Sequence, residues 1–307
     1  MTTVFTYPWT LLRPDVDAAL DRLWDAGIDG LSVASHYHSI QTLNPRAEDA
    51  PLESYPGGLY TDPDPADFED TPIVPPVNPV VGTTDPVTEV VAAAHEHGFE
   101  VGAWTVVFHN TRLVATHPDY RTESAFGTAH DHAFCPSHSD VHEYFAGVVR
   151  SPVRSNVDRI DLESIGFPTA RHGHGSTFGH AMDYALTDRA EELLFSQCFC
   201  DACREAATSY PVDVDRARSL VQELSRQAFQ GPGSSVSSLP DLVDRHPTLE
   251  RLFDFRAAVV EEFVAALADA AGDVLSTTSS PMASGVAPPT DGRLVSDWPI
   301  STTTSTE

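Results

Sequence analysis

Apolar and polar positions change period several times along this chain, and each change marks the boundary of a predicted element. Residues 3–9 are rich in β-branched and aromatic side chains, whereas residues 16–27 place apolar side chains at helical spacing. The predicted strands are residues 3–9, 30–38, 101–110, 157–164 and 273–280, and the predicted helices are residues 16–27, 85–98, 138–151, 212–229 and 249–272. Strands and helices therefore alternate along the first half of the chain.

One predicted helix carries recognisable signals at both ends. Asp85 stands at the N-cap position, where its carboxylate can accept a backbone hydrogen bond, and Pro86 occupies the first helical position. Gly98 follows the last periodic residue and can adopt the left-handed conformation that ends a helix. These signals set the helix boundaries independently of hydrophobic periodicity.

The order of the elements favours a parallel sheet with right-handed crossovers, either closed as a barrel or open and doubly wound. No G-x-G-x-x-G follows the first strand, which argues against a dinucleotide-binding open sheet. Polar residues follow the second, third and fourth strands, where barrel enzymes place their chemistry. We therefore predict an α/β fold of the TIM-barrel type, with the open sheet as the alternative.

The predicted strands are too few for a complete barrel. Residues 276–307 are rich in Ser, Thr and Pro and show little periodicity, so the barrel is expected to be incomplete after its fifth strand. We expect a barrel-like, catalytic-type domain at 1–275 and a poorly ordered or truncated tail at 276–307. A truncated or frameshifted gene product, a partner chain that completes the barrel and a smaller five-stranded fold remain alternatives.

Two segments exceed a minimal barrel repeat. Residues 41–81 form a long connection rich in Pro, Asp and Gly, which we expect to be a loop that lies over a site. Residues 204–270 contain two strongly helical patterns on either side of a Gly-, Pro- and Ser-rich loop. This second segment is expected to be a helical insert.

The charge of the chain excludes some partners. The formal charge is −27, from 18 basic and 45 acidic residues, and such a field repels nucleic acids and anionic membrane surfaces. All 18 basic residues are Arg, and Asp outnumbers Glu by 28 to 17. The composition resembles that of proteins from extremely halophilic archaea, where salt screens the self-repulsion. An acidic protein from a GC-rich organism is the alternative.

The sequence also indicates where the protein resides. No apolar stretch reaches the roughly 18 residues of a membrane-spanning helix, and the N-terminal segment lacks the pattern of a secretory signal. We therefore expect a cytoplasmic protein. Its cysteines are then expected to be reduced or to bind metal rather than to form disulfides.

The four cysteines form the most specific local pattern. Cys198, Cys200 and Cys203 make a C-x-C-x-x-C segment, and Cys135 is the only other cysteine. Four thiolates can bind zinc tetrahedrally, and a site of this kind has no open position for substrate. We expect a structural zinc that connects the loop after the third strand to the segment beyond the fourth. Four reduced thiols that pack as small hydrophobic groups are the alternative.

A family resemblance rests on three segments. FCPSHSDVHEYF, VDRIDLES and CFCDACREA together are similar to family 42 glycoside hydrolases, the β-galactosidases, over roughly Val101 to Ala206. The resemblance implies a structural zinc held by the four cysteines and a general acid/base at Glu163. Leu162 precedes Glu163 where the family has Asn, and the strand that carries the nucleophile of the family is not evident here. Members of that family are often trimers, which leaves a homo-oligomer open.

A second carboxylate lies two residues before Glu163. Asp161 and Glu163 are on one face of the predicted strand, because side chains two apart point to the same side. Glu163 can donate a proton to a glycosidic oxygen, and Asp161 is the second catalytic candidate. An ion pair with Arg159 or a nearby arginine is the alternative interpretation.

Polar and aromatic side chains at the ends of the second and third strands are candidates for substrate binding. Tyr37 and Trp104 can stack on a sugar face, while imidazole and amide groups can hydrogen-bond to hydroxyls. The candidates are His36, Tyr37, His38, Trp104, His109 and Asn110. We therefore expect a carbohydrate ligand, whereas a capping or surface role is the alternative for each histidine alone.

Two further functions remain open. His130, Asp131 and His132, together with His172, His174 and His180, could bind a transition metal in a metal-dependent barrel hydrolase or isomerase, although no fixed ligand spacing supports this. A non-catalytic barrel that binds carbohydrate or a partner chain is the other alternative.

Overall fold

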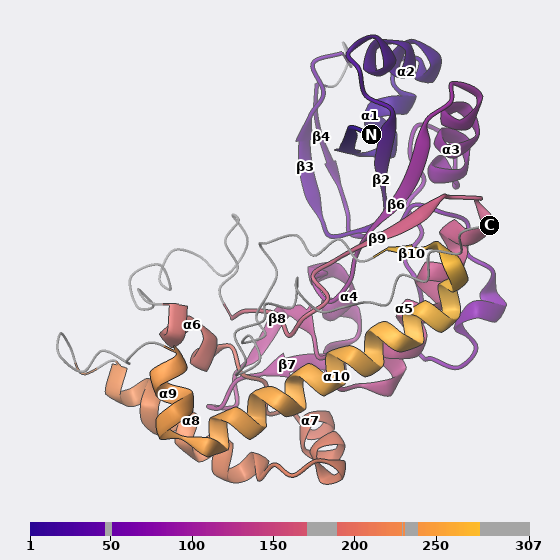
Figure 1. The fold of residues 1–307 in the computed structure, drawn as a ribbon. Helices are drawn as coiled ribbons and strands as arrows, with labels where there is room; N and C mark the ends of the chain where they lie inside the picture. The colour runs from indigo at the N-terminus through magenta and orange to yellow at the C-terminus, as the bar shows by residue number, and fades with distance from the viewer. Residues whose placement is uncertain (47–50, 171–188, 229, 231–238, 277–307) are drawn as a thin grey trace, which may run out of the picture.

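The computed structural model describes residues 1–46, 51–170, 189–228, 230 and 239–276. Its centre is a six-stranded sheet in which five strands are parallel and follow one another in chain order (Figure 1). The five are β1 (Thr3–Thr6), β2 (Gly30–Tyr37), β6 (Glu100–Val106), β9 (Arg159–Glu163) and β10 (Leu275–Ser276). The sixth, β5 (Gly58–Leu59), runs antiparallel to β2.

The order of the parallel strands agrees with a barrel rather than a doubly wound sheet. A doubly wound sheet reverses direction at a switch point, so its first strand lies inside the sheet. Here β1 lies at one end of the order and β10 at the other, with no reversal between them. The expected α/β class and parallel sheet are confirmed, and within the described residues the sheet stays open between β1 and β10.

Helices cover one face of this sheet. Alternate strand residues such as Leu31, Val101 and Ile160 are fully buried and belong to the same apolar cluster as Val90 of α3 and Phe263 of α10. The helices that contribute buried residues to this cluster are α1 (Pro8–Leu12), α2 (Val16–Asp25), α3 (Pro86–Glu96), α4 (Thr111–Thr116), α5 (Ser139–Arg154) and α10 (Pro247–Ala271). The other face of β9 carries Arg159, Asp161 and Glu163.

The predicted ends of one helix are confirmed. The Asp85 carboxylate accepts a hydrogen bond from the Thr88 backbone N–H at 3.3 Å, and Pro86 begins α3. Gly98 has a φ of +85°, a conformation that a side chain would disfavour.

Two predicted strand ends are wrong. The first strand ends at Thr6, because Pro8 begins α1 at a position where its fixed φ suits a helix. The third strand ends at Val106, and Asn110 caps the short helix α4 instead of extending the strand.

The long connection at 41–81 contains regular structure of its own. Strands β3 (Ile40–Leu43) and β4 (Leu52–Tyr55) form an antiparallel hairpin, followed by β5 and the short 3₁₀ helix η1 (Pro65–Phe68). A second antiparallel pair, β7 (Arg121–Glu123) and β8 (Ala129–Phe134), lies between α4 and α5, with η2 (Pro118–Tyr120) before it.

A second lobe is helical and has its own apolar cluster. It consists of α6 (Arg189–Phe195), α7 (Asp201–Ala206), η4 (Ala207–Ser209), α8 (Val214–Ala228), α9 (Leu239–Arg245) and the N-terminal part of α10. Figure 1 shows α10 running from this lobe to the sheet. Its early residues, such as Leu252, belong to the helical cluster, whereas Phe263 and Leu267 belong to the sheet cluster. η5 (Gly272–Val274) then leads into β10.

Among the described residues, no helix combines the length and the apolar character that crossing a bilayer requires. Residues 277–307, which include nearly all of the predicted tail, lie outside the described part of the chain.

Candidate functional site

Glu163 ends β9 at the carboxyl edge of the parallel sheet. The Trp104 indole N–H donates a hydrogen bond of 2.6 Å to its Oε2 atom. Trp104 comes from the neighbouring strand β6. In the parallel pairing of β6 with β9, Trp104 is opposite Asp161, which lies two residues before Glu163. Both side chains are half-buried. Because hydrogen bonds to a charged carboxylate are stronger than neutral ones, this contact orients Glu163 firmly.

The backbone turns sharply immediately after Glu163. Ser164 has a φ of +58°, in the left-handed region that residues other than glycine rarely adopt. Backbone bonds hold the turn: Val107 N donates to Glu163 O at 2.8 Å and Phe108 N to Ser164 O at 3.3 Å. Such conformations often mark ligand sites, because the surrounding structure must hold them in place.

Aromatic rings surround the Trp104–Glu163 pair. The rings of Tyr37, Phe5 and Tyr7 lie 4.6, 5.1 and 5.8 Å from that of Trp104. The Tyr7 hydroxyl donates to the Tyr37 hydroxyl at 3.3 Å. Burial, together with the negative charge of Glu163, raises the pKa of both tyrosines, so their hydroxyls stay protonated and can donate hydrogen bonds.

The hairpin β3–β4 extends this aromatic group. The Trp9 ring stacks between those of Tyr7 and Tyr55, at centroid distances of 4.7 and 3.9 Å. The hairpin is held by an Arg13–Glu53 ion pair of 2.6 Å. Tyr7, Trp9 and Tyr55 were missed by the sequence-based prediction, although Tyr7 and Trp9 stand just after the first strand, where barrel sites gather their residues.

Two of the predicted substrate-binding residues, His36 and Asn110, are buried and form hydrogen bonds within the protein. His36 is fully buried: its Nδ1 donates to Val106 O at 2.6 Å and its Nε2 accepts from the Tyr144 hydroxyl at 3.2 Å. Burial lowers the pKa of His36 to about 4, so the ring is neutral. Asn110 is also fully buried, and its side chain accepts from Leu113 N as the N-cap of α4 and donates to Tyr37 O.

Asp161 is held by an ion pair. Its carboxylate accepts two bonds of 3.1 Å from Arg159 Nε and one of 2.6 Å from the Ser32 hydroxyl. Arg159 also pairs with Glu100 at 2.7 Å. A Cβ atom on Gly102 would collide with the Asp161 carboxylate, so the glycine makes room for this network. These contacts agree with the ion-pair interpretation that the sequence left open.

The remaining candidates form a row of imidazole rings. His38 lies 4.2 Å from the Tyr37 ring and 4.8 Å from that of His109, and both histidines are half-buried. The His109 and His132 rings are 5.8 Å apart, and those of His130 and His132 are 6.0 Å apart. The row therefore adjoins the aromatic group near Glu163 through the contact between Tyr37 and His38.

The second histidine cluster is only partly described. His130 and His132 lie in the imidazole row, whereas the neighbouring Asp131 pairs with Arg121 at 2.7 Å. His172, His174 and His180 lie outside the described residues. Within the part of the chain that is described, the four cysteines are the one group of three or more such side chains arranged to share a metal ion.

The four cysteine sulfurs lie together although one comes from a distant part of the chain. All four side chains are buried, and their Sγ atoms lie within 4.8 Å of one another. Cys135 Sγ is 3.4 Å from Cys203 Sγ and 3.7 Å from Cys198 Sγ. Those separations exceed the roughly 2.0 Å of a disulfide and approach the ~3.8 Å edge of a tetrahedron with ~2.3 Å zinc–sulfur bonds.

Hydrogen-bond donors point at these sulfurs. Glu123 N donates to Cys198 Sγ at 3.2 Å, Ser137 N to Cys135 Sγ at 3.5 Å and the Arg256 guanidinium to Cys203 Sγ at 3.1 Å. Burial alone would raise the pKa of Cys203, but the Cys135 and Cys198 thiols and the charge of Arg256 lower it to about 7. Contacts with the other three cysteines also lower the pKa of Cys200. Burial raises the pKa of the Cys135 and Cys198 thiols well above the usual value. Two of the four sulfurs therefore favour the thiolate, the form that binds metals, and a bound metal ion would displace the protons of the other two.

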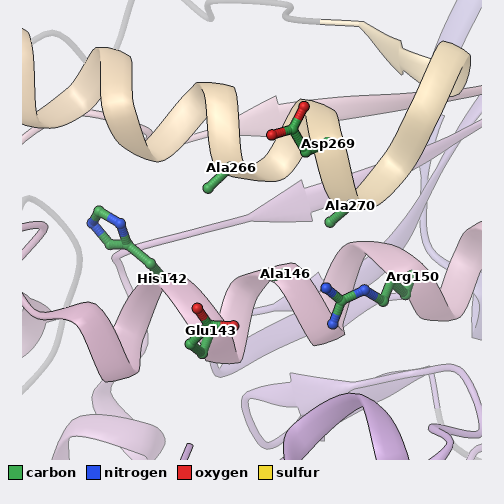
Figure 2. A pocket seen from close by; sticks show the side chains of 7 residues that line it. All are labelled: His142, Glu143, Ala146, Arg150, Ala266, Asp269 and Ala270. Carbon is green, nitrogen blue, oxygen red and sulfur yellow. The ribbon is translucent and has the colours of Figure 1, made fainter. Parts of the chain in front are cut away.

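A cavity of about 290 Å³ lies elsewhere, between α5 and α10 (Figure 2). None of the predicted site residues lines it. Its lining residues are His142, Glu143, Ala146, Arg150, Ala266, Asp269 and Ala270.

Comparisons with known proteins give structural neighbours only. No protein-family model matches the chain, and no curated protein matches it. A β-galactosidase from the psychrophilic Marinomonas ef1 is 13% identical with a TM-score of 0.48, over 91% of this chain and 37% of that one. α-L-Fucosidase isoenzyme 2 from Paenibacillus thiaminolyticus is 11% identical with a TM-score of 0.43, over 85% and 28%. A maltogenic α-amylase, AmyB from Thermotoga neapolitana, is 18% identical with a TM-score of 0.35, over 53% and 39%.

The three neighbours are glycoside hydrolases by name, and this chain spans between 28% and 39% of their lengths. At these identities and TM-scores the superpositions assign neither a family nor an activity to the chain.

Proposed function

We propose that the residues around Glu163 bind a carbohydrate and that Glu163 donates a proton to its glycosidic oxygen. The contact between Trp104 and Glu163 carries the proposal, because it places an acid beside an aromatic surface at the carboxyl edge of a sheet with barrel-type strand order. Aromatic faces bind the apolar faces of sugars, and the Tyr7 and Tyr37 hydroxyls can hydrogen-bond to sugar hydroxyls.

We also propose that the chain is related to the TIM-barrel glycoside hydrolases of family 42. We propose in addition that the protein is cytoplasmic and adapted to high salt. Strand order and the positions of Glu163 and the cysteines support this relation. Protonation by Glu163 would let the bond between the anomeric carbon and the leaving oxygen break, with the proton remaining on the leaving group. In the complete reaction, the oxygen of a water molecule would bond to the anomeric carbon, and the proton that this water loses would pass to a carboxylate. Hydrolysis also needs a second carboxylate, about 5 Å away in retaining enzymes and about 6.5–9.5 Å away in inverting ones.

The test is the hydrolysis of a panel of aryl glycosides in multimolar KCl. We expect Glu163→Gln to lower kcat by about 100-fold or more while sugar binding persists, because general acids contribute roughly that much. Trp104→Phe keeps the ring but removes the N–H that orients Glu163, so kcat should fall about tenfold with little change in KM. Glu89→Gln, on the exposed side of α3, is the matched control.

Each result has a distinct meaning. Equal turnover by the wild-type protein and Glu163→Gln would show that Glu163 is not the acid. Sugar binding without turnover by the wild-type protein would support the non-catalytic alternative, and the absence of both would refute the carbohydrate site.

We also propose that Cys135, Cys198, Cys200 and Cys203 bind one structural zinc ion. The buried sulfurs, their separations and the N–H donors aimed at them support this donor set. Zinc held by four thiolates would stabilise the fold and has no position open for substrate. The four ligands would then connect β8 and its following turn to α7.

Metal analysis tests this second proposal. We expect about one zinc per chain in the wild-type protein and a loss of zinc in Cys200→Ser, because an alcohol is a poor zinc ligand at neutral pH. Ala202→Ser adds the same hydroxyl beside the cluster and should leave the zinc content unchanged. A zinc content unaffected by Cys200→Ser would contradict the proposed ligand set.

A further inference from the structure

One arginine is buried against the cysteine cluster. Arg256, on α10, is 2% exposed. Its Nη1 atom donates to Cys203 Sγ at 3.1 Å, and its Nη2 atom donates to the Cys198 carbonyl oxygen. A single guanidinium therefore contacts one proposed metal ligand through its sulfur and another through its backbone.

The polar side chains beside the Arg256 guanidinium are cysteines rather than carboxylates. Its Nη1 atom donates to Cys203 Sγ, and the other three cysteine sulfurs lie within 4.8 Å of that sulfur. No ion pair between Arg256 and a carboxylate occurs among the described residues. Removing a guanidinium from water is expensive unless a negative group compensates it. Its burial beside four thiols is therefore evidence that the cluster is negative.

Aromatic rings enclose the remaining faces of the guanidinium. Arg256 Cζ lies 4.1 Å from the centroid of the Phe167 ring, 5.6 Å from that of Phe255 and 5.9 Å from that of Phe199. Its Nε atom is buried without a hydrogen-bond partner among the described residues. If this position needed only hydrogen-bond donors, a side chain that leaves a buried donor unused would be a poor choice. If the position needs a positive charge, an arginine is explained.

We propose that Arg256 is the built-in counter-charge of the cysteine cluster and raises its affinity for a divalent metal ion. The inference rests on the proposed zinc site. A zinc ion with four thiolates carries a net charge of about −2, which is costly to bury, and one guanidinium halves it. Arg256 is a positioning residue, because it touches the ligands and not the metal.

The test measures zinc affinity by competition with a chromogenic chelator at one fixed pH. Loss of an outer-sphere partner commonly weakens metal binding by roughly 10- to 100-fold, and we expect that loss for Arg256→Gln, which keeps an N–H donor but no charge. Arg256→Lys keeps the charge and should stay much closer to the wild-type affinity. Arg251→Gln, an exposed position on the same helix, should bind zinc like the wild-type protein.

A ligand change separates charge from packing. Cys200→His replaces a thiolate by a neutral imidazole and so lowers the negative charge of the site. If Arg256 acts through charge, Arg256→Gln should cost much less zinc affinity in the Cys200→His background than in the wild-type background. The double variant is also informative if Arg256→Gln alone does not fold. Because Cys200→His lowers the negative charge of the site, the double variant should fold with zinc. A double variant that also fails to fold would count against the proposal.

The results distinguish failure of this inference from failure of the zinc site. If the wild-type protein binds zinc and Arg256→Gln binds it equally well, or if Arg256→Gln and Arg256→Lys lose the same affinity, the counter-charge role is wrong and the zinc site stands. If the wild-type protein binds no zinc, both are wrong. Absorption of the cobalt-loaded protein in the thiolate charge-transfer region checks that four sulfurs remain ligands in Arg256→Gln.

Discussion

Two carboxylates on one strand have different environments because of their positions along it. Asp161 lies within the sheet, where Arg159 and Ser32 occupy its carboxylate oxygens. Glu163 lies at the strand end, where, among the described residues, one hydrogen bond holds its carboxylate, from the Trp104 indole N–H. The Asp161 side chain is 1% exposed, whereas Glu163 lies at the carboxyl edge of the sheet, where barrel enzymes place their chemistry. Glu163 is therefore the better candidate for contact with a substrate.

His36 makes the stability of the protein depend on pH. Burial lowers its pKa from the usual 6.5 to about 4, so in that range the unfolded chain binds a proton that the native protein does not. Stability attributable to His36 is therefore complete above pH 6.5 and is lost as the pH falls towards 4. Between pH 7 and pH 5 the loss should be about 2 kcal/mol, from ~1.4 kcal/mol per pKa unit.

Urea unfolding at pH 7 and pH 5, at constant KCl concentration, measures this effect. His36→Gln cannot titrate but can still donate to the Val106 carbonyl, so its stability should fall by about 2 kcal/mol less than that of the wild-type protein over this range. Carboxylates titrate in both proteins and cancel in the difference. An equal loss in both would show that His36 does not control the acid sensitivity.

The sequence indicates residue types at the site better than it indicates the direction of each side chain. Glu163 was recognised from its place at a strand end and from the family resemblance, and Trp104 as an aromatic side chain of the third strand. The two side chains do contact each other. His36 and Asn110 fit the same pattern but are buried in the fold. Asn110 instead caps α4, where its short side chain accepts a hydrogen bond from a free N–H group of the first turn. Tyr55 was missed because only the hairpin brings it to Trp9.

At the scale of elements, local sequence signals predict the order of the strands and helices well. They predict the terminal residues of these elements and the inserted hairpins poorly. The alternating pattern of β9 sends Ile160 and Leu162 towards the helices and Arg159, Asp161 and Glu163 to the other face, as a period of two requires. The hairpin β3–β4 forms by pairing between two short segments that contain few apolar residues, so it is difficult to predict from the sequence. Leu43 and Leu52 stay exposed there, so hydrophobic periodicity carried no signal for it.

The loop that follows Glu163 is tied to the cysteine cluster. Phe167 stacks on Arg256, and Ala170 N donates to the Ser196 hydroxyl at 2.8 Å, two residues before Cys198. If zinc holds the cluster together, its removal should loosen this loop even though no ligand belongs to it. The effect would connect a structural metal to the orientation of Glu163.

Hydrogen exchange with and without zinc measures this connection. Removal of zinc by a chelator should increase amide exchange in residues 164–170 as well as around Cys198–Cys203, while exchange in α3 should change little. A loop that keeps its protection while the cysteine segment loses it would show that the two are independent.

At the scale of the whole molecule, charge must be considered together with shape. The chain carries a formal charge of −27, and its ion pairs include several between Arg and Asp or Glu that are partly exposed. Pairs of this kind contribute little individually, so they cannot offset the mutual repulsion of the excess acids. Salt that reaches the surface can reduce that repulsion, because the Debye length falls from about 10 Å at 0.1 M to about 3 Å at 1 M.

We therefore expect the unfolding temperature to rise steeply as KCl increases from about 0.1 M to 1 M, where screening changes most. Beyond that range any further rise should be shallower and should follow the general effect of salts on apolar burial. A series in sorbitol at matched osmolality is the control, because sorbitol does not screen charge. An unfolding temperature that responds equally to sorbitol and KCl would mean that the acidic surface does not limit stability. The acidic composition would then give no support to salt adaptation of this fold.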